Sequence, residues 1–145
     1  MTDTARVLVV AHRTAATPAL LDAVRERAAQ GGATFTLLVP KPVHGADRIA
    51  DPEDVSSDEA QMTLELALPL LEDAAGGPVE GVIGAANPMD AVADAVNTRG
   101  FDEVIISTLP QRVSKWLHLD LPHKVAGLGL PVTTVIATDR APSSV

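Results

Sequence analysis

Short runs of aliphatic and β-branched residues, without alternating polar positions, recur along the chain. Such runs are typical of strands that are buried on both faces of a parallel sheet. We therefore predict five strands, of which the third is weakened by its glycines: Arg6–Ala11, Thr34–Val39, Val79–Gly84, Asp102–Thr108 and Pro131–Ile136.

Between these strands, apolar residues recur at helical spacing. Thr17-Pro18 and Asn87-Pro88 each place a capping side chain before a proline, which indicates the start of a helix. Residues 110–127 also have a helical pattern, interrupted by Pro122. These signals predict helices after the first, third and fourth strands.

The connection between the second and third strands combines a long irregular stretch with a helix. Residues Pro40–Val55 are rich in Pro, Gly and Asp and lack apolar periodicity, so we expect a mobile loop. Ser56 and Glu59 have capping-box spacing and are predicted to open the helix. Pro69 is expected to kink this helix or break it in two. The stripe expected to face the core consists of Met62, Leu66, Leu70 and Ala74.

This alternation of strand and helix predicts an α/β fold, a doubly wound, Rossmann-like parallel sheet of five strands with helices on both faces. The 145 residues suit one domain, and we expect residues 1–138 to form it, followed by a flexible tail, 139–145. Ligands of such sheets bind beyond the carboxyl ends of the strands, where the strand order reverses. We expect a functional site in that crevice.

Composition narrows the classes of function. The formal net charge of −8 works against binding to nucleic acid and against docking on an anionic membrane. The absence of cysteine excludes disulfides, thiolate nucleophiles and thiolate metal ligands. The first residues have the pattern of neither a signal peptide nor a membrane anchor, so a cytoplasmic protein is expected.

No signature of catalysis or of a metal site stands out. The histidines lack the adjacent-turn spacing of a helical zinc site, and no P-loop, Gly-x-Gly-x-x-Gly or Gly-x-Ser-x-Gly motif occurs. A triad of Ser107, His12 and an Asp could be drawn on paper, but any chain of this size allows one. We therefore predict no catalytic residue, no bound metal and no enzymatic activity.

Residues at the predicted strand ends are the candidates for a binding site. Arg13 could contact an anion, and His12 could contact a ligand or carry a proton. The simpler alternative is that both residues form a polar strand end that faces water. Arg112 lies in a locally basic segment of an otherwise acidic chain. The complete candidate set is His12, Arg13, Val39, Asn87, Ser107, Thr108, Arg112 and Ser114.

Three segments carry a resemblance to a known family. Val79–Val92 holds a strand, a small residue and the Asn-Pro that opens the next helix. Gly100–Ile106 has an Asp before a hydrophobic strand, and Leu130–Val132 begins the last strand. In order and spacing, residues 5–137 resemble a divergent member of the universal stress protein family. The resemblance implies the strand order 3-2-1-4-5, a role in stress response, ATP as a ligand and a homodimer formed through the last strand.

The chain departs from that family at the residues that hold ATP. The family pattern is Gly, two residues, Gly, nine residues, Gly, then Ser or Thr, and its positions are occupied here by Ser107, Pro110, Asp120 and Leu121. Side chains therefore replace glycines whose backbone amides approach phosphates, and Pro110 has no N–H to donate. Ala11 or His12 stands where the family has an Asp. No cofactor is expected, and ATP remains open only as a ligand held by charged side chains such as Arg112.

Three interpretations of function follow. The leading one is a non-enzymatic module that acts as a homodimer and through an unidentified protein partner, without nucleic acid or membrane. The second is an ATP or AMP sensor with a variant phosphate site that uses Arg112. The third is an enzyme related to nucleotide α-hydrolases, and it is the weakest because Ala11–Ala15 contains no glycine to grip a pyrophosphate.

Overall fold

The architecture comes from a computed structural model of the chain. It describes residues 4–11, 15, 17–40, 52–84, 87–108 and 120–136, without the side chains of 52–59 and of residue 88. Residues 41–51 of the expected 40–55 loop lie outside the described residues, and so does the tail, 139–145. The ends of that prediction are wrong, because Pro40 belongs to a strand and residues 52–55 belong to a helix.

Five parallel strands form one sheet in the order β3-β2-β1-β4-β5, as predicted. The strands are β1 (Ala5–Val10), β2 (Ala33–Pro40), β3 (Val79–Gly84), β4 (Glu103–Thr108) and β5 (Val132–Ile136). The predicted bounds differ from these by no more than one residue at either end, because the apolar runs themselves define the strands. The order reverses between β1 and β4, which places the expected crevice beyond the carboxyl ends of these two strands.

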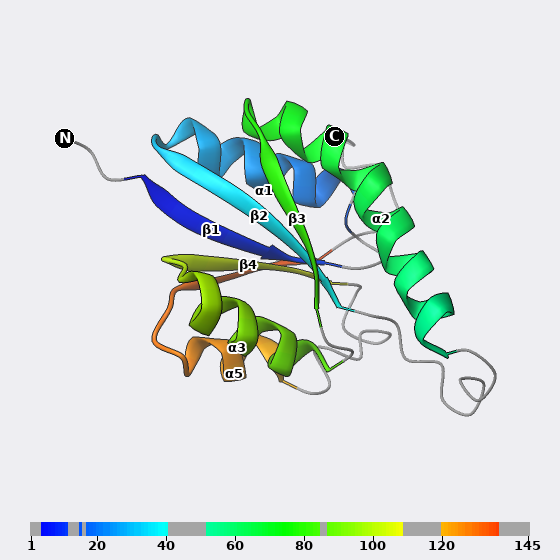
Figure 1. The fold of residues 1–145 in the computed structure, drawn as a ribbon. Helices are drawn as coiled ribbons and strands as arrows, with labels where there is room; N and C mark the ends of the chain where they lie inside the picture. Colours follow the sequence, from blue (N-terminus) through cyan, green and yellow to red (C-terminus); the bar gives the residue numbers. More distant parts are fainter. Residues whose placement is uncertain are drawn as a thin grey trace.

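Helices cover both faces of the sheet (Figure 1). One face carries α1 (Pro18–Ala29) and α2 (Pro52–Ala75), and the other carries α3 (Pro88–Arg99) and α5 (Leu121–Ala126). Because side chains alternate along a strand, β1 supplies both layers: Val7 and Val9 face the first pair of helices, and Leu8 and Val10 face the second.

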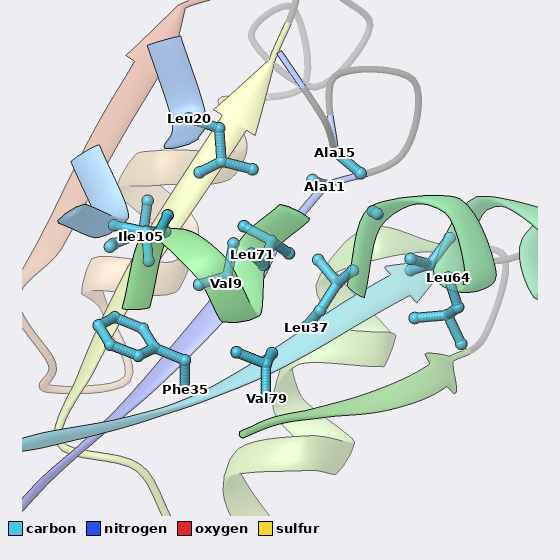
Figure 2. Packing of buried hydrophobic residues seen from close by; sticks show 14 of the residues in the cluster. Val9, Ala11, Ala15, Leu20, Phe35, Leu37, Leu64, Leu71, Val79 and Ile105 are labelled. Carbon is cyan, nitrogen blue, oxygen red and sulfur yellow. The ribbon is translucent and has the colours of Figure 1, made fainter. Parts of the chain in front are cut away.

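The first layer of the core is built almost wholly of aliphatic side chains. Leu20 of α1 and Leu71 of α2 pack there over Val9 and Leu37, and Phe35 closes the cluster toward the beginning of the strands (Figure 2). Aliphatic residues can fill both faces because a parallel sheet under two helical layers is shielded from water on both sides.

Helix α2 differs from its prediction at its start and along its length. It begins at Pro52, four residues before the predicted capping box, and it runs without a break through Pro69. The proline is exposed, so water can reach the carbonyl that it leaves without an N–H partner.

The buried stripe of α2 is also different from the predicted one. The residues that face the core are Ala60, Leu64, Ala67, Leu71 and Ala74, so only Ala74 was predicted correctly. Small residues let the helix lie close to β3, where a Cβ on Gly81 would stand 2.9 Å from a methyl group of Leu64. Close approach therefore selects the alanine-containing stripe over the larger one, and Met62, Leu66 and Leu70 are left exposed.

Candidate functional site

The candidate site is the carboxyl end of the sheet at β1 and β4, where the strand order reverses and a crevice is expected. In the register of the sheet, Val10 lies opposite Leu38 on one side and Ile106 on the other. The next residues along β2 and β4, Val39 and Ser107, therefore stand level with each other on either side of the chain that leaves β1. The structure brings these two predicted site residues, together with Thr108, to one edge of the sheet.

The predicted residues on β2 and β4 are buried at that edge. Ser107 is 1% exposed and Thr108 is 4% exposed, and both take part in interactions within the protein. The side chain of Val39 belongs to the hydrophobic core. The side chains of these three residues are therefore enclosed by the protein and are not open to a ligand in the described structure.

Asn87 caps helix α3. Its Oδ1 accepts hydrogen bonds from the backbone N–H groups of Met89, at 2.9 Å, and Asp90, at 3.1 Å. These amides are the donors that a helix start would otherwise offer to an anion. Asp90 adds a negative charge in the same turn, so the start of α3 is satisfied by the chain itself.

Asp120 and Leu121 lie just before and at the start of α5. They are the residues that the resemblance aligns with the third glycine and the hydroxyl of the family pattern. Asp120 has φ 59° and ψ 38°, and it is the only residue other than glycine with a positive φ in the described part of the chain. The backbone thus keeps a conformation that favours glycine. The Asp120 carboxylate lies 3.1 Å from Nδ1 of the exposed His123.

Leu121 is part of the core. It is 1% exposed and packs in the cluster that contains Leu8, Val10 and Ile106. An aliphatic side chain enclosed in this way offers no hydroxyl to a ligand. At the position for which the resemblance implies a phosphate contact, the side chain makes a packing contact.

The ion pairs that join described elements lie at the opposite edge of the sheet. Arg27 pairs with Glu103 at the start of β4, and Arg99 pairs with Glu80 near the start of β3. The hydrogen bonds that Arg27 donates to the Glu103 carboxylate raise the pKa of Arg27, with an opposing effect from partial burial and a further increase from the Glu103 charge. Both arginines pair with residues near the beginnings of strands, at the opposite end of the sheet from the candidate site.

Four members of the candidate set, His12, Arg13, Arg112 and Ser114, lie outside the described residues. Among the residues that are described, no group of three or more His, Cys, Asp or Glu side chains could hold a metal ion. None of the described helices is both long enough and apolar enough to cross a membrane.

Sequence comparison finds no relative: no family model matches the chain, and no curated protein matches it. Similarity appears at the level of solved structures.

A universal stress protein from Archaeoglobus fulgidus has a TM-score of 0.61 at 14% identity, and the match covers 90% of this chain and 93% of that one. A universal stress protein from the same organism in complex with dAMP has a TM-score of 0.59 at 16% identity, covering 93% of this chain and 99% of that one. A universal stress protein family protein from Arabidopsis thaliana with AMP bound has a TM-score of 0.63 at 14% identity, covering 94% of each chain.

These matches extend over nearly the whole chain and agree with the observed strand order. The identities are low, so they establish architecture and not ancestry. The chain has the fold of the universal stress proteins.

Proposed function

We propose that this chain is a non-enzymatic module with the universal-stress-protein fold that acts by binding proteins and does not hold ATP through the family's glycine pattern. The observation that carries the proposal is the burial of Leu121 in the core, where that pattern requires a hydroxyl beside the phosphates.

The neighbouring positions support the same conclusion. Ser107, which the resemblance aligns with the first glycine, is buried near the end of β4. Asp120, which it aligns with the third glycine, has a carboxylate that would repel a triphosphate. The start of α3, which follows the carboxyl end of β3, is capped by Asn87 and carries Asp90. Each of these features removes a means by which the fold could grip phosphate.

Titration of the purified chain with ATP, with and without magnesium, tests the proposal. We expect no saturable binding at millimolar ATP. Tight, magnesium-dependent binding would overturn it.

We also propose that the chain forms a homodimer through β5, which is an edge strand of the sheet. Thr133 and Thr134 are exposed there, and the β-branched composition of the strand suits pairing with a second copy. Light scattering at micromolar concentration should show a dimer that Thr134→Lys converts to a monomer. Thr98→Lys, the same change at an exposed position of α3, should leave the dimer intact. A monomeric wild-type chain would eliminate this part of the proposal.

A second candidate function is binding of an adenine nucleoside monophosphate. Its support is that structures with the same fold carry AMP or dAMP. A monophosphate needs fewer phosphate contacts than ATP, so charged side chains could replace the glycine loop. Calorimetric titration with AMP should then show affinity that falls with added salt and in Arg112→Ala. Affinity unchanged on both counts would remove this candidate.

A further inference from the structure

The outward side of α2 carries a row of large apolar side chains. Met62, Leu66 and Leu70 are 59%, 69% and 45% exposed, and they follow one another at intervals of four residues. Side chains four residues apart lie above one another on a helix, so the three form a continuous ridge about 12 Å long. We call these three residues the α2 ridge.

Among the described residues, exposed large hydrophobic side chains are concentrated on α2. The other large hydrophobic side chains that are exposed among the described residues are Leu128 and Ile136, on separate elements. Single exposed hydrophobic residues are normal on a protein surface, whereas aligned ones indicate an interaction site. The fold does not need the ridge, because a different face of α2 fills the core.

The charges around the ridge restrict what can bind to it. Glu65 and Asp73 are exposed on the same helix, each three residues after a member of the ridge, and Nε2 of Gln61 donates to Oε2 of Glu65 at 3.0 Å. The whole of α2 contains no Lys or Arg. Two copies that packed ridge against ridge would bring acidic helices together, and an anionic membrane would be repelled. A basic partner is favoured.

We propose that the α2 ridge docks a basic amphipathic helix of a partner protein. Apolar residues of the partner, spaced by four, would pack along the ridge, and its Lys and Arg side chains would face Glu65 and Asp73. Two ridges of this spacing pack at a crossing angle of about −50°. The flexible side chain of Met62 suits a surface that adapts to its partner. The inference rests on the proposed protein-binding function and specifies the chemistry of the partner.

A synthetic peptide tests this directly. The probe is a fluorescently labelled amphipathic helix of about 18 residues, five turns, with Leu on one face and Lys on the other. Titration with the full chain should give saturable binding in the micromolar range that weakens as salt is added. Leu66→Gln should weaken binding at least tenfold. The matched control is Leu128→Gln, which replaces an exposed leucine away from α2 and should leave binding unchanged.

Three results would overturn the proposal. One is equal affinity of the wild type and Leu66→Gln for the peptide. Another is equal binding of a scrambled peptide, which would reduce the effect to bulk charge attraction. The third is self-association of the chain that Leu66→Gln abolishes, because the ridge would then bind a second copy. None of these involves nucleotide or β5, so they leave the proposed function standing, whereas ATP binding would remove that function without changing the peptide result.

Discussion

Arg27 and Glu103 form a two-pronged ion pair between the end of α1 and the start of β4. The guanidinium donates from Nε to Oε1 at 2.9 Å and from Nη2 to Oε2 at 3.0 Å. Both side chains are mostly buried, at 18% and 25% exposure. The pair joins residues 76 positions apart in the sequence and ties α1 to the start of β4, beside the central strand.

Replacement of Glu103 by Gln should lower the free energy of unfolding by about 1–2 kcal/mol, because it removes a charge-assisted, two-pronged contact that water only partly screens. Urea unfolding measures this change. The exposed pair of Arg25 and Asp22 on α1 provides the control, and Asp22→Asn should change stability by less than about 0.5 kcal/mol. Equal effects of the two substitutions would show that the Arg27–Glu103 pair contributes no more to the free energy of unfolding than an exposed ion pair.

The same pair predicts a pH dependence. Because the folded state raises the pKa of Arg27, its contribution is fully present below the ordinary arginine pKa and is lost only as pH rises through the folded value. The difference in unfolding free energy between wild type and Glu103→Gln should therefore stay constant from about pH 7 to about pH 10. A difference that shrinks across this interval would contradict an Arg27 that stays charged in the folded state.

Asn87 should act through stability and not through ligand contact. Asn87→Ala removes the acceptor for the amides of Met89 and Asp90, and the expected loss is about 1 kcal/mol of unfolding free energy. Asn87→Ser, which retains a capping oxygen, should restore most of it. A ligand affinity that fell in both variants at unchanged stability would instead assign Asn87 to a binding site.

Leu121 should behave as a core residue. Leu121→Ala should cost about 2–5 kcal/mol in thermal or urea unfolding, because it leaves a cavity under α5. Leu128→Ala, at an exposed leucine shortly after the same helix, should cost less than about 1 kcal/mol. Comparable, small losses at both positions would mean that Leu121 is not packed in the core and could face a ligand.

The fold class could be predicted because strands buried on both faces appear in the sequence as continuous apolar runs. Val7, Leu8, Val9 and Val10 are all apolar since both faces of β1 are covered, and Asn87 before Pro88 marks the start of α3. The strand order followed from a family resemblance and not from the pattern of residues.

The orientation of α2 could not be predicted in the same way. Its sequence holds two apolar stripes, one with Met62 and Leu66 and one with Leu64 and Leu71, and periodicity alone does not rank them. The closeness of α2 to Gly81 decides between them, and that is a property of the packed structure. The signal that could have identified the buried stripe is the repeat of Ala60, Ala67 and Ala74 at intervals of seven.

Only part of the candidate site could be anticipated. Ser107 and Thr108 were placed correctly at the carboxyl edge because strand ends follow from strand positions, but their burial depends on the layers packed around them. His12, Arg13, Arg112 and Ser114 remain predictions. The role of Asn87 as a helix cap could be predicted from its position before Pro88.

The most direct test of the central claim is a thermal-shift titration of the purified chain with ATP, with and without magnesium, and with AMP in parallel. A ligand at a hundred times its dissociation constant adds about 2.7 kcal/mol, which raises Tm by several degrees in a protein of about this size. The account predicts no change in Tm at millimolar ATP under either condition. A magnesium-dependent rise of several degrees would contradict it and would mean that side chains perform the task of the missing glycines.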